Sequence, residues 1–408
     1  MRVTVSIFKR TTTAVSRRFA SGEPLIRTAL YELHKDLKGK MVPFAGYELP
    51  VLYDGLGLKA EHVHCRTPGF ASLFDVSHMG QIKWYGADRA AFIEKAVVGD
   101  VAGLGEGEAK LTLVVKDTGG IVDDAVLANA GDHVYMVVNG ACKAKDMDHF
   151  KALMAENPSM DVTMEYMGDT EQALVALQGD GAKNVLDALL PAGFDLEKMA
   201  FMTGVYTTLA GYDVRVTRCG YTGEDGFEIS MKESDALAIS KLLLESTAAK
   251  VLPCGLGARD SLRLEAGLCL YGNDLNEDIN PVEAALVWTL GPPGSRRRLE
   301  QSFIGASNFL TPEGKAKKMT KKRVGFLGHD KPARENSKIF DAAGEKEIGV
   351  ITSGSFSPCL GVPIAMGYVD VAHAKNDTEV VIEVRGKKVA SKVAKMPFVP
   401  SKYWRVPE

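Results

Sequence analysis

Apolar stretches of strand length, separated by turn residues, are prominent after residue 110. Three of them follow one another at residues 111–116, 121–128 and 133–139. Asp117-Thr118-Gly119-Gly120 separates the first two, residues 129–132 separate the next two, and both connections have the composition of tight turns. Strands joined by such short turns pair with their neighbours in antiparallel fashion. The pattern predicts a three-stranded meander.

Stretches with apolar residues on one helical face lie between groups of strands. In residues 233–250, Leu237 and the leucines at 242–244 gather towards one side of the expected helix. Similar patterns predict further helices at residues 28–37, 87–97, 178–190 and 259–268. The Gly- and Pro-containing residues 41–50 predict a loop. Hairpin-linked strands mixed with helices indicate an α+β fold rather than a doubly wound parallel sheet.

The chain after residue 290 divides into two parts, leaving residues 23–290 as the α+β region. Residues 291–322 open with Gly291-Pro292-Pro293-Gly294, which breaks regular structure, and basic residues outnumber acidic ones across the segment. This composition predicts a basic, solvated linker. Further short strand candidates lie at residues 323–327, 348–353, 365–369, 379–384 and 388–392. They predict a small all-β barrel or jelly roll over residues 323–408.

The N-terminal segment, residues 1–22, differs in charge from the rest of the chain. It carries five basic residues, seven Ser or Thr and no acid, although the whole chain has a net charge of −3. This composition is typical of a mitochondrial transit peptide. The alternative is a basic tail that binds an anionic partner. The six cysteines form no CxxC pair, so free thiols in a reducing compartment are expected.

Several chemistries lack their sequence signatures. No GxGxxG follows a predicted strand and no GxxxxGK[ST] occurs, so nicotinamide, flavin and P-loop nucleotide sites are not expected. GxSxG is also missing, so α/β-hydrolase chemistry is not expected either. No apolar run reaches the ~18 residues of a membrane span. The basic residues of 291–322 lack the interleaved aromatics of a nucleic-acid site. His62-Val63-His64-Cys65 has no third ligand at suitable spacing, so no metal is expected there.

Two acidic residues, Asp123 and Asp124, interrupt an otherwise apolar strand. Side chains alternate between the faces of a strand, so these two carboxylates point in opposite directions. A buried carboxylate needs a hydrogen-bond donor or a cation, because its desolvation costs free energy. The pattern does not decide which Asp faces a functional site, and either could be a structural residue.

Two further motifs could bind a polar ligand. The glycine-bracketed loop of residues 220–226 carries Glu224, whose carboxylate could accept paired N–H donors from a heterocycle. Arg259 and Arg263 lie one turn apart on a predicted helix and could bind a carboxylate or a ring carbonyl. An ordinary hairpin turn and a salt-bridged surface are the respective alternatives.

Motifs along most of the chain resemble the glycine cleavage T-protein family. They are Phe74-Asp75-Val76-Ser77-His78-Met79, Gly119-Gly120-Ile121-Val122-Asp123-Asp124, the loop at 220–226, Gly257-Ala258-Arg259-Asp260-Ser261-Leu262-Arg263-Leu264-Glu265-Ala266-Gly267, Thr352-Ser353-Gly354 with Ser357-Pro358, and Met396-Pro397-Phe398-Val399-Pro400. They occur in the family's order after residue 25. Each motif alone is weak, whereas the ordered set is specific.

The resemblance implies a three-lobed fold with a ferredoxin-like meander, a C-terminal barrel and a central cavity for tetrahydrofolate. It implies transfer of a one-carbon unit from the aminomethyl-dihydrolipoyl group of H protein to tetrahydrofolate in the mitochondrial matrix, alongside the P and L proteins. Asp123 matches the family's essential aspartate, which sits beside the folate nitrogens that receive the carbon. Glu224 and Arg259 match its pterin-binding pair. The further folate-lining positions are Met79, Asn139 and Tyr403.

Two other classes share this folate-binding fold. One is a demethylating oxidoreductase in which the module is fused to a flavin domain, whose fingerprint the sequence lacks. The other is a non-catalytic folate-binding protein of iron–sulfur or tRNA maintenance, which carries a KGCYxGQE-like motif that is also missing.

For the H-protein partner, the basic residues at 296–298 and 315–323 are the expected docking patch.

Overall fold

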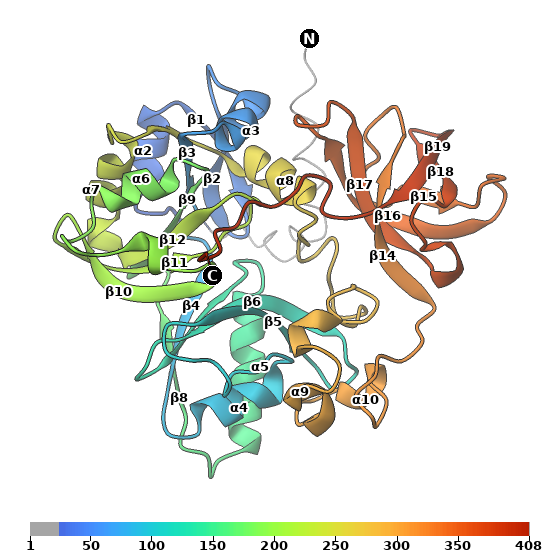
Figure 1. The fold of residues 1–408 in the computed structure, drawn as a ribbon, viewed down its shortest axis with the longest axis horizontal. Helices are drawn as coiled ribbons and strands as arrows, with labels where there is room; N and C mark the ends of the chain where they lie inside the picture. Colours follow the sequence, from blue (N-terminus) through green and yellow to red (C-terminus); the bar gives the residue numbers. More distant parts are fainter. Residues whose placement is uncertain (1–23, 408) are drawn as a thin grey trace.

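The computed structural model describes residues 24–407, which form three lobes around a common centre (Figure 1). The expected transit peptide lies outside the described residues. One lobe contains a six-stranded sheet, the second contains a five-stranded sheet, and the third is a closed six-stranded barrel. The predicted α+β fold with a C-terminal barrel is confirmed. Among the described residues, no helix is both long and apolar enough to cross a membrane.

The first lobe is built on a sheet with the strand order β10-β11-β12-β9-β3-β13. Its strands are β3 (Phe70–Asp75), β9 (Gln172–Gln178), β10 (Thr203–Leu209), β11 (Tyr212–Arg218), β12 (Gly226–Lys232) and β13 (Lys250–Pro253). Within this sheet only β13 and β3 pair in parallel. Strand β9 lies inside the sheet and is buried on both faces, which explains its continuous apolar run.

Helices cover both faces of this sheet. They are α2 (Tyr31–Asp36), α3 (Leu58–Arg66), α6 (Ala182–Asp187), η1 (Leu196–Lys198), α7 (Glu233–Leu244) and α8 (Leu256–Glu265). Val185 of α6 and Ile239 of α7 share a core with Val175 of β9. Leu262 of α8 packs in a second core with Ala176, the next residue along β9. Because successive strand residues face opposite ways, α8 lies across the sheet from α6 and α7.

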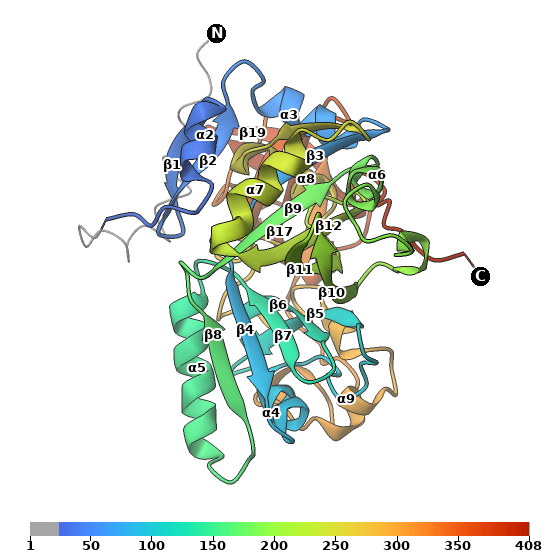
Figure 2. The same cartoon turned by 90° about the vertical axis from the view of Figure 1, so that its left-hand side faces the viewer.

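The second lobe contains the predicted meander. Its strands are β4 (Gly80–Tyr85), β5 (Ala109–Val115), β6 (Ile121–Asn129), β7 (Val134–Val138) and β8 (Thr163–Met167), in the order β5-β6-β7-β4-β8, with helices α4 (Arg89–Ala96) and α5 (Lys143–Glu156). Strands β5, β6 and β7 pair in antiparallel fashion, as expected. Figure 2 shows the first lobe above the second, with α5 running alongside β8.

The segment at 291–322 is not a solvated linker. Following η2 (Val287–Leu290), it contains α9 (Arg296–Glu300) and α10 (Ala306–Phe309) and packs against the second lobe. Phe303 and Phe309 enter a core that also contains Leu113 of β5. The sequence suggested a linker because Phe303 and Phe309, which anchor the segment, are few apolar residues among many basic ones.

The third lobe is a barrel with the strand order β14-β17-β16-β15-β18-β19. Its elements are β14 (Lys321–Leu327), β15 (Lys338–Phe340), β16 (Glu347–Phe356), β17 (Pro363–Asp370), η3 (Val371–His373), β18 (Glu379–Val384) and β19 (Lys387–Ala394). After β19 the chain leaves the barrel and crosses to the first lobe (Figure 1). The amide of Phe398 donates to the carbonyl of Glu265, and that of Lys402 donates to the carbonyl of Gly223.

Two local predictions were wrong. Residues 41–50 belong to a hairpin of β1 (Gly39–Phe44) and β2 (Tyr47–Tyr53). Both strands of a two-stranded sheet are edge strands, so a proline is tolerated wherever the backbone N–H would not donate to the partner strand. The stretch at 178–190 begins as the end of β9, because its glycines at 179 and 181 delay the start of α6.

Candidate functional site

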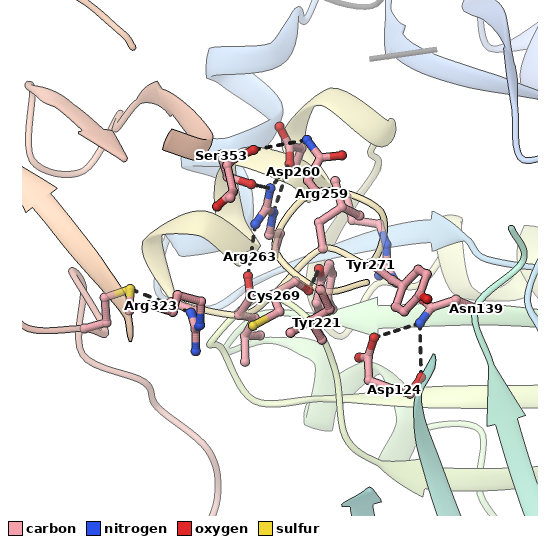
Figure 3. A pocket seen from close by; sticks show the side chains of 18 of the residues that line it. Asp124, Asn139, Tyr221, Arg259, Asp260, Arg263, Cys269, Tyr271, Arg323 and Ser353 are labelled. Atoms are coloured by element: carbon pink, nitrogen blue, oxygen red, sulfur yellow. Dashed lines mark hydrogen bonds and ion pairs between the residues drawn. The ribbon is translucent and has the colours of Figure 1, made fainter. Parts of the chain in front are cut away.

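A cavity of about 1640 Å³ lies where the three lobes meet. Asp124 and Asn139 line it from the second lobe, and Tyr221 and Arg259 line it from the first (Figure 3). Arg323 of β14 lines its barrel side. The cavity exceeds the ~300–1,000 Å³ that is usual for one small ligand. It can therefore hold a substrate together with a second reacting group.

The aspartate pair is split between the cavity and the protein interior. Asp124 lines the cavity, whereas Asp123 is 0% exposed and does not line it. Asn139, which follows β7, connects the two: its Nδ2 lies 2.8 Å from Asp123 Oδ1 and 2.9 Å from Asp124 Oδ1. The prediction that Asp123 faces the ligand is therefore corrected to Asp124. Strand alternation required one inward and one outward carboxylate but could not say which was which.

The buried side of the pair is rich in acidic groups. Asp123 accepts the backbone N–H of Asn139 at 2.9 Å, and Asp146 of α5 lies against it. Burial, reinforced by the negative charge of Asp123, raises the pKa of Asp146 well above its usual value. Asn139, which lines the cavity, therefore holds Asp123 behind the cavity wall.

The cavity-facing carboxylate titrates near neutrality. Burial, followed by the charge of Asp123, raises the pKa of Asp124 to about 7. A carboxylate with such a pKa can exchange a proton at physiological pH, which is what a general acid or base requires. Tyr271 also lines the cavity, and Figure 3 places its ring near Asn139.

Glu224 does not reach the cavity. It is 2% exposed, forms ion pairs with Arg66 at 3.0 Å and Lys402 at 3.2 Å, and is not among the lining residues. Glu228, two residues into β12, lines the cavity instead. Burial raises the pKa of Glu228, and the nearby positive charge of Arg259 partly offsets this rise. The predicted Glu224–Arg259 pair is therefore corrected to Glu228 and Arg259.

The two arginines of α8 have different surroundings. Arg263 is bound to Asp274 at 2.7 Å and to Ser353 of the barrel at 2.8 Å, so it joins α8 to the barrel. Arg259 lines the cavity, its guanidinium lies 4.7 Å from the centre of the Tyr221 ring, and its Nη1 has no partner among the described residues. An unpaired buried donor costs free energy unless a ligand accepts from it. Arg259 is thus the member of the pair that can bind a ligand.

Three further predicted positions line the cavity, namely Met79, Asn139 and Tyr403. Tyr403 reaches it from the C-terminal segment and stacks on Phe201, with ring centres 4.0 Å apart. The sequence analysis missed Glu228, although a Glu between Phe227 and Ile229 is an acid in an apolar strand. The argument applied to the aspartate pair could have found it.

The basic residues at 296–298 do not form a docking patch. Arg297 is 0% exposed and Arg298 is buried, and both donate to backbone carbonyls. Arg296 is more exposed but forms ion pairs with Glu94 and Asp100. These arginines hold α9 against the second lobe. Residues 296–298, the first half of the predicted docking patch, are therefore not available to a partner.

Two family models match the chain, one over the first two lobes and the other over the barrel. The GCVT N-terminal domain matches residues 30–292. The glycine cleavage T-protein C-terminal barrel domain matches residues 321–400.

Individual relatives are similar over nearly the whole length. The mitochondrial aminomethyltransferase of Dictyostelium discoideum is 45% identical over 95% of this chain and 96% of its own, and that of Gallus gallus is 46% identical over 96% and 97%. The crystal structure of glycine cleavage system aminomethyltransferase T from Bartonella henselae superposes with a TM-score of 0.84 at 37% identity, covering 94% of this chain and all of that one. The chain therefore belongs to the glycine cleavage T-protein family of aminomethyltransferases.

Proposed function

We propose that the chain transfers the one-carbon unit of aminomethyl-dihydrolipoyl H protein to tetrahydrofolate. The products are 5,10-methylenetetrahydrofolate, ammonia and dihydrolipoyl H protein. The methylene carbon loses its bonds to sulfur and to the amine nitrogen and gains bonds to N5 and N10 of the folate. The two protons released from these nitrogens end on the thiol and on ammonia. No oxidant or reductant is needed.

The carboxylate of Asp124 in the central cavity is the observation that carries this proposal. The transfer passes through a cationic, iminium-like species, which a nearby carboxylate stabilises. A pKa of about 7 lets the same group accept a proton from a folate nitrogen. Asp123 is a positioning residue here, since it contacts Asn139 and not the cavity.

The size of the cavity supports two reactants in one site. Folate and the end of a lipoyl arm must meet there, and about 1640 Å³ is more than one of them needs. Glu228 and Arg259 offer an acceptor and a donor on the wall of the first lobe, which suits the N–H groups and the carbonyl of a pterin ring. Met79, Asn139 and Tyr403 complete the proposed folate wall.

The folate site makes a direct prediction. Arg259→Ala and Glu228→Gln should each weaken tetrahydrofolate binding by about 1–3 kcal/mol, the usual range for a hydrogen bond to a charged group. Isothermal titration calorimetry on folded variants measures this. Glu224→Gln is the matched control, because Glu224 is also buried but faces Arg66 and Lys402. Unchanged affinity in the first two variants, or an equal loss in the control, would contradict the proposal that Glu228 and Arg259 bind the pterin ring.

We also propose that residues 1–22 direct the chain to the mitochondrial matrix. The relatives from Dictyostelium discoideum and Gallus gallus are both named mitochondrial. A fusion of residues 1–25 to a fluorescent protein should enter mitochondria, because the segment is basic and lacks acids. The control replaces Arg10, Arg17 and Arg18 with Glu and should stay in the cytosol. Cytosolic or plastid fluorescence of the unmodified fusion would contradict the prediction.

The proposed partner is lipoylated H protein, which the P and L proteins load and reoxidise. The lipoyl arm has to enter the same cavity that holds folate, so H protein must dock at its mouth. The second half of the predicted basic patch remains available, since Lys315, Lys317 and Lys318 are exposed. Lys322 and Arg323 lie at the cavity itself.

A further inference from the structure

A cluster of potential metal ligands lies outside the central cavity. His62 of α3, Glu265 of α8 and Cys359, in the turn between β16 and β17, each offer one ligand atom, and these atoms lie within 4.8 Å of one another. His62 Nε2 is 3.0 Å from Glu265 Oε2 and 3.6 Å from Cys359 Sγ. None of the three lines the central cavity.

The distances suit a tetrahedral ion. Zinc bonds of about 2.0–2.3 Å to nitrogen, oxygen and sulfur place neighbouring ligand atoms roughly 3.3–3.6 Å apart. The nitrogen–sulfur distance of 3.6 Å already has this value. The nitrogen–oxygen distance of 3.0 Å is that of a hydrogen bond and has to open by a few tenths of an ångström.

The surrounding hydrogen bonds orient the ligands. The Ser261 hydroxyl lies 3.1 Å from the carbonyl of Ala258, to which it donates, and 2.7 Å from His62 Nδ1. It therefore accepts from Nδ1–H, which leaves Nε2 facing Glu265 and Cys359. The hydroxyl of Ser357 and the backbone N–H of Cys359 donate to Glu265 Oε1, whereas Oε2 faces His62 and accepts from Arg66. Metal-binding histidines are commonly held by such a second bond on the other ring nitrogen.

The carboxylates around the cluster already have cationic partners. Arg66 pairs with both Glu265 and Glu224, and Lys402 also pairs with Glu224. A divalent ion bound to the thiolate of Cys359 therefore adds one net positive charge to the cluster. Zinc binds the thiolate form of a cysteine, so the ion has to displace the thiol proton of Cys359 and binding strengthens as pH rises.

We propose that His62, Glu265 and Cys359 bind Zn²⁺, with solvent as the fourth ligand. Cys359 is exposed, so the ion can enter from the surface. The bound ion would join α3 and α8 of the first lobe to the barrel. The sequence analysis expected no metal at His62, because Glu265 and Cys359 lie 203 and 297 residues away along the chain.

Cobalt(II) is the spectroscopic probe for this site. Titration of the reduced full-length chain should reach one Co²⁺ per chain and give a sulfur-to-cobalt charge-transfer band, because the other five cysteines are buried. Cys359→Ser should abolish the band and weaken binding by at least ~10–100-fold, the loss that follows removal of even a supporting residue. His62→Gln should weaken binding similarly, whereas His373→Gln, at a histidine outside the cluster, should not.

A second measurement follows the predicted link between the lobes. Excess Zn²⁺ should raise the melting temperature of the wild-type chain by mass action on the folded state. The rise should be lost in Cys359→Ser, whose exposed position leaves folding intact. The proposal is overturned if no charge-transfer band forms, if the band survives Cys359→Ser, or if Zn²⁺ stabilises that variant equally.

Discussion

Asp124→Asn should lower the rate of one-carbon transfer by about 10²–10⁴-fold, the usual loss when one acid–base group is removed. Asp124 carries the carboxylate that lies in the cavity and titrates near neutrality, and an amide can neither accept the proton nor stabilise a cation. Tetrahydrofolate should still bind, because Glu228 and Arg259 are unchanged. Rapid-quench measurement of transfer at saturating folate tests this.

Asp123→Asn is the matched control, one residue along the same strand. Its carboxylate is 0% exposed and holds Asn139, so its replacement should act mainly on stability and on the placement of Asn139. Transfer by Asp124→Asn within about twofold of wild type, together with a severe loss in a stable Asp123→Asn, would return the catalytic role to Asp123.

The pH dependence should follow the same group. With the carboxylate as the active form, the wild-type transfer rate should rise as pH passes through about 7, and Asp124→Asn should lack this step. The folded-state pKa is raised, so the group's contribution to stability is present below its unfolded pKa of about 4 and is lost as pH rises through about 7. Asp124→Asn should therefore be more stable than wild type at pH 8, with a smaller difference at pH 5.

Arg297→Met should lower the free energy of unfolding by about 1–3 kcal/mol for each buried carbonyl that loses its donor, here those of Glu94 and Val97. Arg297 is 0% exposed, lies 3.3 Å from Glu94 Oε2 and donates to the carbonyl of Val97 at 2.7 Å. The methionine keeps most of the side-chain volume but supplies no donor. The midpoint and slope of urea unfolding give the change.

Arg296→Met is the control for that prediction. Its side chain is 36% exposed, and pairs at such positions contribute about 0–1 kcal/mol. Equal losses in the two variants would show that α9 is held by general charge attraction and not by the buried guanidinium of Arg297.

The fold was predictable where the hydrophobic pattern is regular. The meander and the barrel strands have strand-length apolar runs between turn residues, and both are present close to their expected bounds. The packing of residues 291–322 was not predictable, because Phe303 and Phe309 are isolated apolar residues whose partners, such as Leu113, are remote in sequence.

The site was predictable in type but not residue by residue. An acid within an apolar strand indicates a constrained group, and this holds for Asp123, Asp124 and Glu228 alike. Asp123 faces Asp146 of α5, which leaves Asp124 on the cavity side of the sheet, and local sequence does not contain the position of α5. Glu224 looked functional because its loop is rich in glycine, whereas its partners Arg66 and Lys402 come from distant segments.

The central claim is tested most directly by ammonia release from aminomethyl-dihydrolipoyl H protein. The account predicts rapid release with methylenetetrahydrofolate formation when the full-length chain and tetrahydrofolate are both present, and at most slow release without the folate. Release in Asp124→Asn should fall by the about 10²–10⁴-fold expected for the lost carboxylate. Release that is independent of tetrahydrofolate, or no release by the folded wild-type chain, would contradict the account.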